Sequence, residues 1–455
     1  MTTLRVRTDP TEPITTIPAR VRLLDWAPGR PAATIQASAD FYQGWRPTRA
    51  AADLLVLGAA VYCADKTTRR AMAPDLWTRQ LTLEIPTADP SPWQQADLAA
   101  TLGFLTGDHW TLEPYCQPRH PFTGLDPNPV PEATVGLEAD AICLFSGGLD
   151  SLCGAIDLLE HSPDMRLCLL SHHEGGQAST AQHTLLDALT NTYGSDRIVS
   201  RRLHLRPAPK DPRQARPLPR ARENTTRSRS LLFLTTALAM ASACGPDTPV
   251  YIPENGFIGI NVPLTRARVG SASTRTTHPH FLARLAEAAE VLGITNPILN
   301  PYRYKTKGEI LADSANPTLL RHLAPESVSC SHPEAARYVG RPQGNCGYCF
   351  PCLIRRASLA HVGWDDDPYA WDVFAPDDRD YLMTPRRRRG ADLRAVLTGA
   401  FAERPDHDVL SNGPIPEGEH EAFLGVWRRG LTELRAWLSH GTGKRPPATG
   451  IGNNV

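Results

Sequence analysis

One stretch limits the fold of this chain more than any other. Residues 141–145 form an apolar run of the kind found in strands that are buried on both faces of a sheet. They are followed by Ser-Gly-Gly-Leu-Asp-Ser at 146–151 and by a helical pattern over 152–160. A buried strand, a glycine turn and a helix in this order predict an α/β fold with a parallel sheet and helices on both of its faces.

The glycine turn is suited to hold phosphate groups. Gly147 and Gly148 lack a Cβ, so their backbone can approach an anion closely and direct successive amides toward it. The N-terminus of the next helix adds unpaired amides and a partial positive charge. Ser146 and Ser151 would contribute hydroxyls, and Asp150 would supply the hard oxygen that a Mg²⁺ on the phosphates needs. An ordinary strand-to-helix turn is the alternative.

Length and charge narrow the class of protein. At 455 residues the chain exceeds what one core usually fills, so two or three domains are expected. Hydrophobic residues make up 41% and charged residues 21%, as in ordinary globular proteins. Because 48 basic residues balance 48 acidic ones, no net field draws the chain to nucleic acid or to a membrane. Direct nucleic-acid binding is therefore not expected.

The compartment follows from the apolar runs and the cysteines. The first residues lack the apolar segment of a secretory signal, and the runs 54–62 and 231–241 are too short to span a bilayer. We therefore expect a cytoplasmic protein that does not associate with membranes. In that reducing compartment the ten cysteines should not form disulfides, so a cluster among them favours metal binding or catalysis.

Three parts are expected along the chain. Residues 1–135 should form an accessory α+β domain, 136–375 the domain that carries the chemistry, and 376–455 a helical extension. Five prolines mark 117–131 as the linker after the first domain. In the first domain, apolar patterns predict strands over 21–25, 81–85 and 110–113 and helices over 51–64 and 93–105.

The strand predicted after the glycine turn, 166–171, leads into a loop that contains His172, His173 and Gln177. Ligands bind at the carboxyl ends of parallel strands, so this loop should border the nucleotide. The two histidines could bind a metal, but neighbours on an extended chain point in opposite directions. A simple loop role is therefore favoured for them.

A nearly all-apolar helix is predicted over 231–243, and its N-terminus carries an electrostatic conflict. Arg227 and Arg229 precede it in what should be the first turn. Positive charge there opposes the helix dipole by roughly 0.3–1 kcal/mol for each residue. An anion bound at this end would resolve the conflict. Asn224 or Thr225 is the expected N-cap.

Two polar segments supply candidates for substrate binding. Glu254 follows a predicted strand and could share Mg²⁺ with the aspartate of the glycine turn, or it could belong to an ordinary turn. The segment 265–280 is rich in hydrogen-bond donors and cannot build a core. Its Arg275, Thr277 and His278 would suit an anionic polar heterocycle and are the substrate candidates.

Four cysteines predict a metal site. Cys346, Cys349 and Cys352 lie within seven residues, and Cys330 lies upstream of them. Cys-x₂-Cys turns direct both sulfurs at one tetrahedral ion, and a fourth thiolate closes the site. Four sulfurs with no free ligand position indicate a structural Zn²⁺. An iron–sulfur cluster and a redox dithiol are the alternatives.

Residues 146–151, with Leu149 between the glycines and the aspartate, resemble the pyrophosphate loop of the PP-loop ATP pyrophosphatases. Enzymes of this family cut ATP between its α and β phosphates and adenylate a carboxylate or carbonyl oxygen. The resemblance implies that all six loop residues contact ATP and that Asp150 takes part in catalysis. The Walker A loop is different, because it needs a Gly-Lys-Ser/Thr ending.

The glycine turn together with Ser329-Cys330 and the Cys-Gly-x-Cys-x-x-Cys segment resembles QueC, the 7-cyano-7-deazaguanine synthase family, over residues 141–360. This resemblance implies ATP, Mg²⁺ and Zn²⁺ as cofactors. The chain departs from that family by fifteen residues between Cys330 and Cys346 and by its added N-terminal and C-terminal parts. The long layout resembles QatC, the QueC-like component of the Qat anti-phage system, which implies partner proteins from a defence operon.

Three further residues match elements of the QueC family. Gln177, in a Gly-Gln pair, matches a position after the second strand and should contact the nucleotide. Arg229 matches an arginine beside the ATP phosphates. Lys307, in the Thr-Lys-Gly-Glu-Ile element at 306–310, could reach the transferring phosphate, although a solvated lysine at a helix start is the alternative.

The expected function is ATP-dependent ligation. Asp150 and Mg²⁺ would hold the pyrophosphate, Arg229 and Lys307 would stabilise charge on the transferring phosphate, and a 7-deazaguanine-type carboxylate would be adenylated. An amine, either ammonia or a protein N-terminus, would then displace AMP. A tRNA-modifying PP-loop transferase and a non-catalytic assembly subunit are the other two readings.

Overall fold

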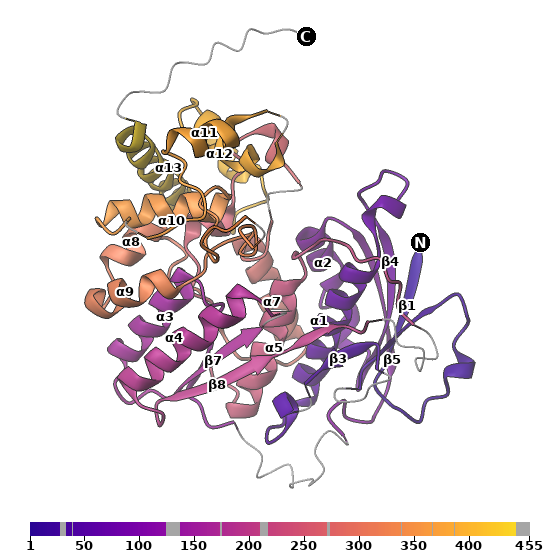
Figure 1. Ribbon diagram of the computed structural model, residues 1–455. Coiled ribbons are helices and arrows are strands. Elements are labelled where there is room, and N and C mark those ends of the chain that lie inside the picture. The colour runs from indigo at the N-terminus through magenta and orange to yellow at the C-terminus, as the bar shows by residue number, and fades with distance from the viewer. Residues whose placement is uncertain are drawn as a thin grey trace.

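Figure 1 shows the computed structural model of the chain. The structure describes residues 1–27, 33–38, 40–123, 137–172, 175–209, 217–270, 274–337, 339–365, 367–385 and 387–442. Most of the expected linker lies outside these ranges, as do His173 and residues 443–455. Among the described helices, none combines the length and the apolar character that a membrane crossing would require.

The N-terminal part contains a four-stranded sheet in the order β2-β1-β4-β5. The strands are β1 (Thr2–Arg7), β2 (Arg22–Asp25), β4 (Gln80–Thr87) and β5 (His109–Cys116). Three of them were predicted, but β1 was not. All neighbours pair in parallel, so this part is α/β and not the expected α+β. The unforeseen β1 lies inside the sheet and joins β2 to β4, and the parallel order depends on it.

Two helices accompany this sheet, α1 (Arg49–Thr67) and α2 (Leu98–Thr106), and both fall in regions where helices were predicted. Nearly all of α1 is buried, as expected for a helix that is apolar around its whole circumference. A short strand, β3 (Ile35–Ala37), pairs in antiparallel fashion with β9 (Leu205–Pro207) of the next part. The N-terminal part is therefore bonded to the rest through its backbone as well as through its core.

The second sheet has five strands in the order β11-β10-β6-β7-β8, and all neighbours are parallel. They are β6 (Ala141–Leu144), β7 (Leu167–His172), β8 (Ile198–Leu203), β10 (Val250–Tyr251) and β11 (Ile298–Leu299). Successive residues of β6 face opposite sides of the sheet. Ile142 belongs to one hydrophobic cluster and Cys143 belongs to another. Both faces of the sheet are therefore covered, as the apolar run predicted.

One face of this sheet is covered by α3 (Leu149–His161) and α4 (Gln177–Tyr193), and the other by α5 (Arg229–Cys244) and α7 (Pro279–Val291). In Figure 1, α5 lies between the two sheets and beside α1. The two helices approach closely, since a Cβ on Gly58 of α1 would lie 2.1 Å from Thr235 Oγ1 of α5. One hydrophobic cluster therefore spans both sheets.

Seven more helices are described, and all but α6 lie in the orange to yellow region of Figure 1. They are α6 (Gly256–Ile260), α8 (Lys307–Ala312), α9 (Pro317–Leu323), α10 (Phe350–His361), α11 (Pro376–Met383), α12 (Ala391–Gly399) and α13 (His420–Thr442). The apolar face of α13 packs against α10 and α6. Its buried side chains include Phe423, Trp427, Leu431, Leu434 and Leu438. The last long helix is thus part of the core.

Candidate functional site

The predicted strand, glycine turn and helix are confirmed as β6, residues 145–148 and α3. Gly147 has φ of +79°, in the left-handed region that favours glycine. A Cβ there would lie 3.0 Å from Gln182 Cγ and 3.2 Å from the Gln182 backbone nitrogen. Any other residue at 147 would therefore be strained and would push against α4.

The amides of this turn contact hydroxyl oxygens. The Gly148 N–H donates to Ser146 Oγ at 3.3 Å, and the Leu149 N–H donates to Ser329 Oγ at 3.0 Å. The Ser151 hydroxyl lies 3.2 Å from Ser146 Oγ and donates to the Gly148 carbonyl at 2.9 Å. Two successive amides and three serine hydroxyls therefore gather at the N-terminus of α3, which is the arrangement expected of an anion-binding turn.

A buried carboxylate lies at the start of α3. Asp150 Oδ1 is 2.6 Å from Lys307 Nζ, and both side chains are almost wholly buried. Lys307 is the first residue of α8, where Thr306 and Glu309 form a capping box that fixes the start of the helix. Asn255 Nδ2 donates to the other oxygen, Asp150 Oδ2, at 2.7 Å. The solvated-lysine alternative is therefore wrong, because Lys307 points inward at the aspartate.

A second carboxylate adjoins the first. The Asn255 amide that holds Asp150 also donates to Glu254 Oε1 at 3.2 Å. Burial and the neighbouring Asp150 carboxylate raise the pKa of Glu254 well above its ordinary value. Burial also acts to raise the pKa of Asp150, but Lys307 and the hydrogen bonds from its neighbours hold it below its ordinary value. Two carboxylates next to an anion-binding turn provide the hard oxygen ligands that Mg²⁺ prefers.

Arg229 reaches the glycine turn through two other residues. It is the first residue of α5, and its Nη2 donates to the His172 carbonyl, at the end of β7, at 2.9 Å. Gln182 Nε2 donates to the same carbonyl at 3.3 Å and to the Ser146 carbonyl at 3.1 Å. The predicted arginine is therefore near the turn. Gln182 was not foreseen, because a glutamine inside an amphipathic helix gives no local signal.

Gln177, the first residue of α4, is hydrogen-bonded to two distant side chains. Its N–H donates to Glu334 Oε1 at 2.9 Å, and its side chain donates to Gln343 Oε1 at 3.0 Å. These partners belong to the segment around the cysteines. The hydrogen bonds described for Gln177 therefore join α4 to that segment and not to the glycine turn.

Two of the three substrate candidates have structural contacts, and the third lines a cavity. Arg275 donates to the carbonyls of Phe104 at 2.9 Å and Asn412 at 2.7 Å, so it joins α2 to the C-terminal region. His278 is buried and caps α7, and burial lowers its pKa to about 3. Thr277 lines a cavity of about 190 Å³. The described bonds of Arg275 and His278 do not reach the glycine turn.

The four predicted cysteines come together. Their sulfurs all lie within 4.8 Å of one another. The Cys330 and Cys349 sulfurs are 3.8 Å apart, and the Cys346 and Cys352 sulfurs are 3.9 Å apart. Zn–S bonds of about 2.3 Å in a tetrahedron place sulfurs about 3.8 Å apart. The cluster could therefore bind a metal such as Zn²⁺.

Backbone amides surround these sulfurs. The N–H groups of His332 and Cys346 point at the Cys330 sulfur at 3.2 and 3.3 Å. Such donors stabilise thiolates, which is the form that binds metal. Directly before this cluster, the Val328 N–H donates to the Gly147 carbonyl at 2.9 Å, and Ser329 accepts from Leu149. The cysteine segment therefore supports the glycine turn.

A cavity of about 510 Å³ lies beside the cysteine segment. It is lined by Ser331, His332, Pro333, Glu334, Ala335, Tyr348, Arg388 and Arg389. The rings of His332 and Tyr348 are stacked, with centroids 6.2 Å apart.

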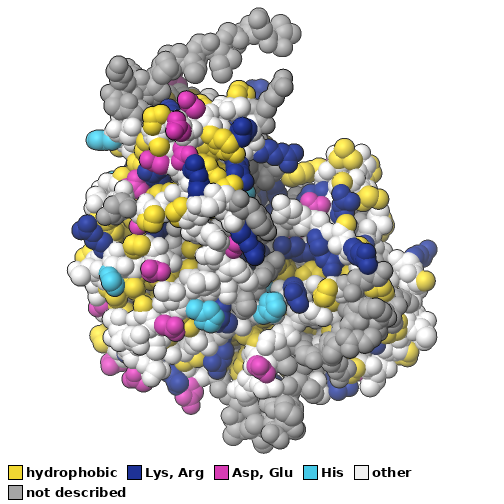
Figure 2. Space-filling model, viewed as in Figure 1, with side chains coloured by type: hydrophobic (Ala, Val, Ile, Leu, Met, Phe, Trp, Pro, Cys, Tyr) yellow, Lys and Arg dark blue, Asp and Glu magenta, His cyan; other side chains and the backbone are white. Residues whose placement is uncertain are grey.

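Figure 2 shows that Lys and Arg side chains gather along the seam between the N-terminal part and the rest, although the whole chain has no net charge.

The chain is similar to 7-cyano-7-deazaguanine synthase of Novosphingobium aromaticivorans. The two are 30% identical over 146 residues, which cover 30% of this chain and 53% of that protein. The chain thus spans about half the length of the curated relative it matches. The similarity supports the resemblance to the QueC-like family. No protein-family model and no solved structure matches the chain.

Proposed function

We propose that this chain is an ATP-dependent enzyme of the adenylating PP-loop type. The observation that carries the proposal is the cluster at the start of α3. Amides and hydroxyls gather there, and directly beside them lies a buried Asp150 paired with Lys307 at 2.6 Å. A structural turn has no need of a buried lysine and two carboxylates, because burying such charges costs free energy. A nucleotide-binding turn uses them.

The turn would hold the β and γ phosphates of ATP. The Gly148 and Leu149 amides now donate to hydroxyl oxygens, and phosphate oxygens can accept in the same way. Asp150 and Glu254 would hold Mg²⁺, whose role is to neutralise the charge of the phosphates. Placed between these groups, the pyrophosphate would leave the α phosphate open to in-line attack.

The reaction would join a carboxylate to AMP. A carboxylate oxygen of the substrate attacks the α phosphorus, the bond to the bridging oxygen breaks, and pyrophosphate leaves with its electron pair. Lys307 and Arg229 would stabilise the charge that develops on the transferring phosphate. An amine then attacks the acyl carbon and AMP leaves. The products are an amide, AMP, pyrophosphate and a proton. When the amine is ammonia, a second ATP would adenylate the amide oxygen, and loss of AMP and a proton would then give the nitrile.

The substrate class follows from the similarity to 7-cyano-7-deazaguanine synthase and from the cavity beside the cysteines. Stacked rings of His332 and Tyr348 suit a planar heterocycle. Arg388 and Arg389 suit a carboxylate. We propose a 7-deazaguanine-type acid as the substrate, with ammonia or a protein amine of a defence partner as the acceptor.

A metal site and a division into domains complete the proposal. The four cysteines would bind a structural Zn²⁺, since all ligand positions are taken by sulfur. The division at residues 135 and 375 into an accessory domain, a PP-loop domain and a helical extension is also proposed. The accessory domain shares its core with α5, so the boundary at 135 separates sequence segments and not independent cores.

ATP–pyrophosphate exchange with 7-carboxy-7-deazaguanine tests this function. We expect exchange that needs both the acid and Mg²⁺, and a loss of about 100-fold or more in Asp150→Asn. Glu160→Gln on the same helix is the matched control, because its oxygen can still accept from Asn316 and Tyr193. Full activity of Asp150→Asn would refute the mechanism. Exchange that depends on tRNA would favour a tRNA-modifying transferase.

A further inference from the structure

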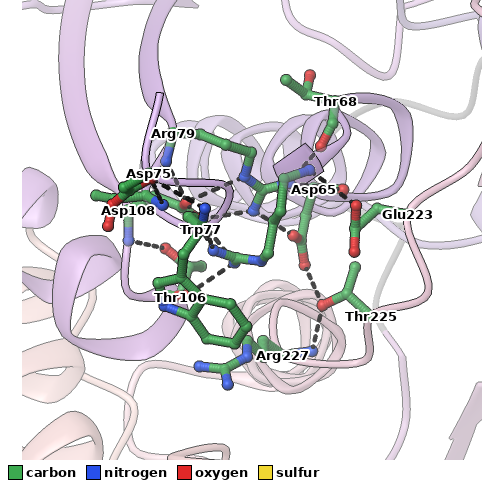
Figure 3. A network of polar contacts seen from close by, with 12 residues as sticks. Asp65, Thr68, Asp75, Trp77, Arg79, Thr106, Asp108, Glu223, Thr225 and Arg227 are labelled. Carbon is green, nitrogen blue, oxygen red and sulfur yellow. Dashed lines mark hydrogen bonds and ion pairs between the residues drawn. The ribbon is translucent and has the colours of Figure 1, made fainter. Parts of the chain in front are cut away.

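The N-terminal part holds the start of α5 with a buried carboxylate. Asp65, near the end of α1, is fully buried. Its Oδ2 accepts hydrogen bonds from Ser228 Oγ at 2.7 Å and from Thr225 Oγ1 at 3.0 Å. Figure 3 shows Asp65 between Arg79 and Thr225. Ser228 is the N-cap residue of α5, and the next residue is Arg229.

The position of Asp65 is itself fixed by a network of buried charges. Arg79 Nη2 lies 2.6 Å from Asp65 Oδ1 and 2.6 Å from Asp108 Oδ2. Arg70 pairs with Asp108 through two more bonds of 2.9 and 3.0 Å. Two arginines and two aspartates thus balance each other away from water. Because a buried charge that loses its partner is costly, this network resists displacement.

A second pair of bonds holds the chain just before α5. The Glu223 N–H donates to the Lys66 carbonyl at 2.8 Å, and the Glu223 carboxylate accepts from the Arg70 N–H at 2.8 Å. Residues 223–228 are therefore attached at both ends to residues 65–70 of the N-terminal part. Little freedom remains for the first turn of α5.

Asp65 also supplies negative charge at the N-terminus of α5, where two arginines oppose the helix dipole. Arg227 and Arg229 place positive charge where the helix dipole disfavours it. An anion was expected there, and the chain supplies one in the Asp65 carboxylate, bonded to the N-cap residue. The expected N-cap was too early, because Thr225 uses its hydroxyl for Asp65 and α5 begins at Arg229.

We propose that Asp65 is a positioning residue for the adenylation reaction. Through Ser228 it fixes the first turn of α5 so that Arg229 stays against the His172 carbonyl, at the edge where the glycine turn lies. This assigns the N-terminal part a task in the reaction. The kinetic part of the proposal rests on the proposed function, whereas the fixing of the helix start does not.

The test compares two buried aspartates of α1. Asp53 is as buried as Asp65, pairs with Arg49 at 2.9 Å and accepts from the Ala88 N–H at 2.9 Å. Its described bonds do not involve α5. Asp53→Asn is therefore the matched control for Asp65→Asn, since each removes one buried charge from the same helix.

Two measurements are made on the full-length protein. In ATP–pyrophosphate exchange, Asp65→Asn should lower kcat about 10- to 100-fold with little change in the KM for ATP, since a slightly misplaced group loses mainly transition-state contacts. In an Arg229→Ala background the same change should add almost nothing. Amide hydrogen exchange of residues 226–232 should become faster in Asp65→Asn and stay unchanged in Asp53→Asn.

The outcomes are distinct. Equal losses of kcat from Asp65→Asn with and without Arg229 would overturn the proposal, because they would show an effect that does not pass through the arginine. Unchanged hydrogen exchange at 226–232 in Asp65→Asn would also overturn it. If the unaltered protein shows no ATP–pyrophosphate exchange, the proposed function fails, and the hydrogen-exchange comparison still decides whether Asp65 fixes the helix start.

Discussion

Asp150 and Glu254 share the Asn255 amide, but their pKa values are shifted in opposite directions. Lys307 favours the ionised form of Asp150, whereas burial and Asp150 itself favour the protonated form of Glu254. Divalent cations bind carboxylates only in their ionised form. Under the proposed function, Mg²⁺ therefore competes with a proton for Glu254.

This pair predicts a pH dependence. The raised pKa means that Glu254 stabilises the metal-free fold when protonated, so the free energy of unfolding should fall as pH rises through that pKa. Glu254→Gln stays neutral and should remove this fall. Denaturant unfolding across pH without Mg²⁺ measures it, with the exposed Glu287→Gln as the control. A fall of equal size in Glu254→Gln would contradict the assignment.

The Mg²⁺ requirement of the unaltered protein should also depend on pH. As pH rises through the same pKa, the Mg²⁺ concentration that gives half-maximal exchange should decrease, because fewer protons compete for Glu254. In Glu254→Gln this concentration should be higher and independent of pH in that window.

The sequence predicted those residues whose chemistry is contained in a short motif. The glycine turn and the four cysteines carry their geometry in their spacing. Ser329, Asn255 and Gln182 act at the turn from distant segments, and their spacing carries no such signal. Arg275 is the opposite case. Its donor-rich segment predicted a ligand, but its described hydrogen bonds go to backbone carbonyls. Its partners, the Phe104 and Asn412 carbonyls, lie 171 and 137 residues away in the chain.

The cysteine segment and α8 act on the glycine turn as whole elements. The segment reaches the turn through Val328 and Ser329, and α8 reaches it through Lys307. A second acid supports α8, because Glu433 of α13 accepts from the Gly308 N–H at 3.3 Å. The helix capping could be predicted from Thr306 and Glu309, but the contribution of α13 could not.

Loss of the metal should lower the stability of the protein, because the cysteine segment supports the glycine turn. Cys349→Ser should reduce bound Zn²⁺ from one per chain to almost none and lower the thermal midpoint, since binding free energy is also folding free energy. Metal analysis and calorimetry measure these effects. Cys116→Ser, at an exposed position of β5, is the control. Iron with visible absorption in the unaltered protein would instead indicate an iron–sulfur cluster.

Across the whole molecule, α1 and α5 bind the two sheets into one core. The apolar patterns of both helices were visible in the sequence, because helices buried on all sides have no polar face. Which buried helix packs on which could not be predicted, since apolar surfaces carry little directional information. The parallel N-terminal sheet was missed because β1 was not predicted, since only Leu4 and Val6 of its six residues are apolar.

The closest approach of the two helices can be tested by adding one methyl group. Gly58→Ala should destabilise the protein by about 1–3 kcal/mol, because the new Cβ would meet Thr235 Oγ1. Gly425→Ala in α13 is the control, since its nearest neighbour is the flexible end of Arg429. It should be neutral or stabilise by up to about 1 kcal/mol. Both are measured by denaturant unfolding.

A second change separates the clash from other causes. Thr235→Ala removes the atom that the added methyl would meet, so it should relieve much of the loss in Gly58→Ala. If the two losses simply add, the helices do not meet at these residues.

The sandwiched position of α5 bears on how the protein is made. While the ribosome is still translating the second half, α1 is already complete, yet the helix that shields it ends only at Cys244. Until then the apolar side of α1 that packs on α5 is exposed to water in the nascent chain. Such intermediates aggregate readily. A ribosome-associated chaperone should therefore raise the yield of folded protein more for this chain than for one whose N-terminal domain folds independently.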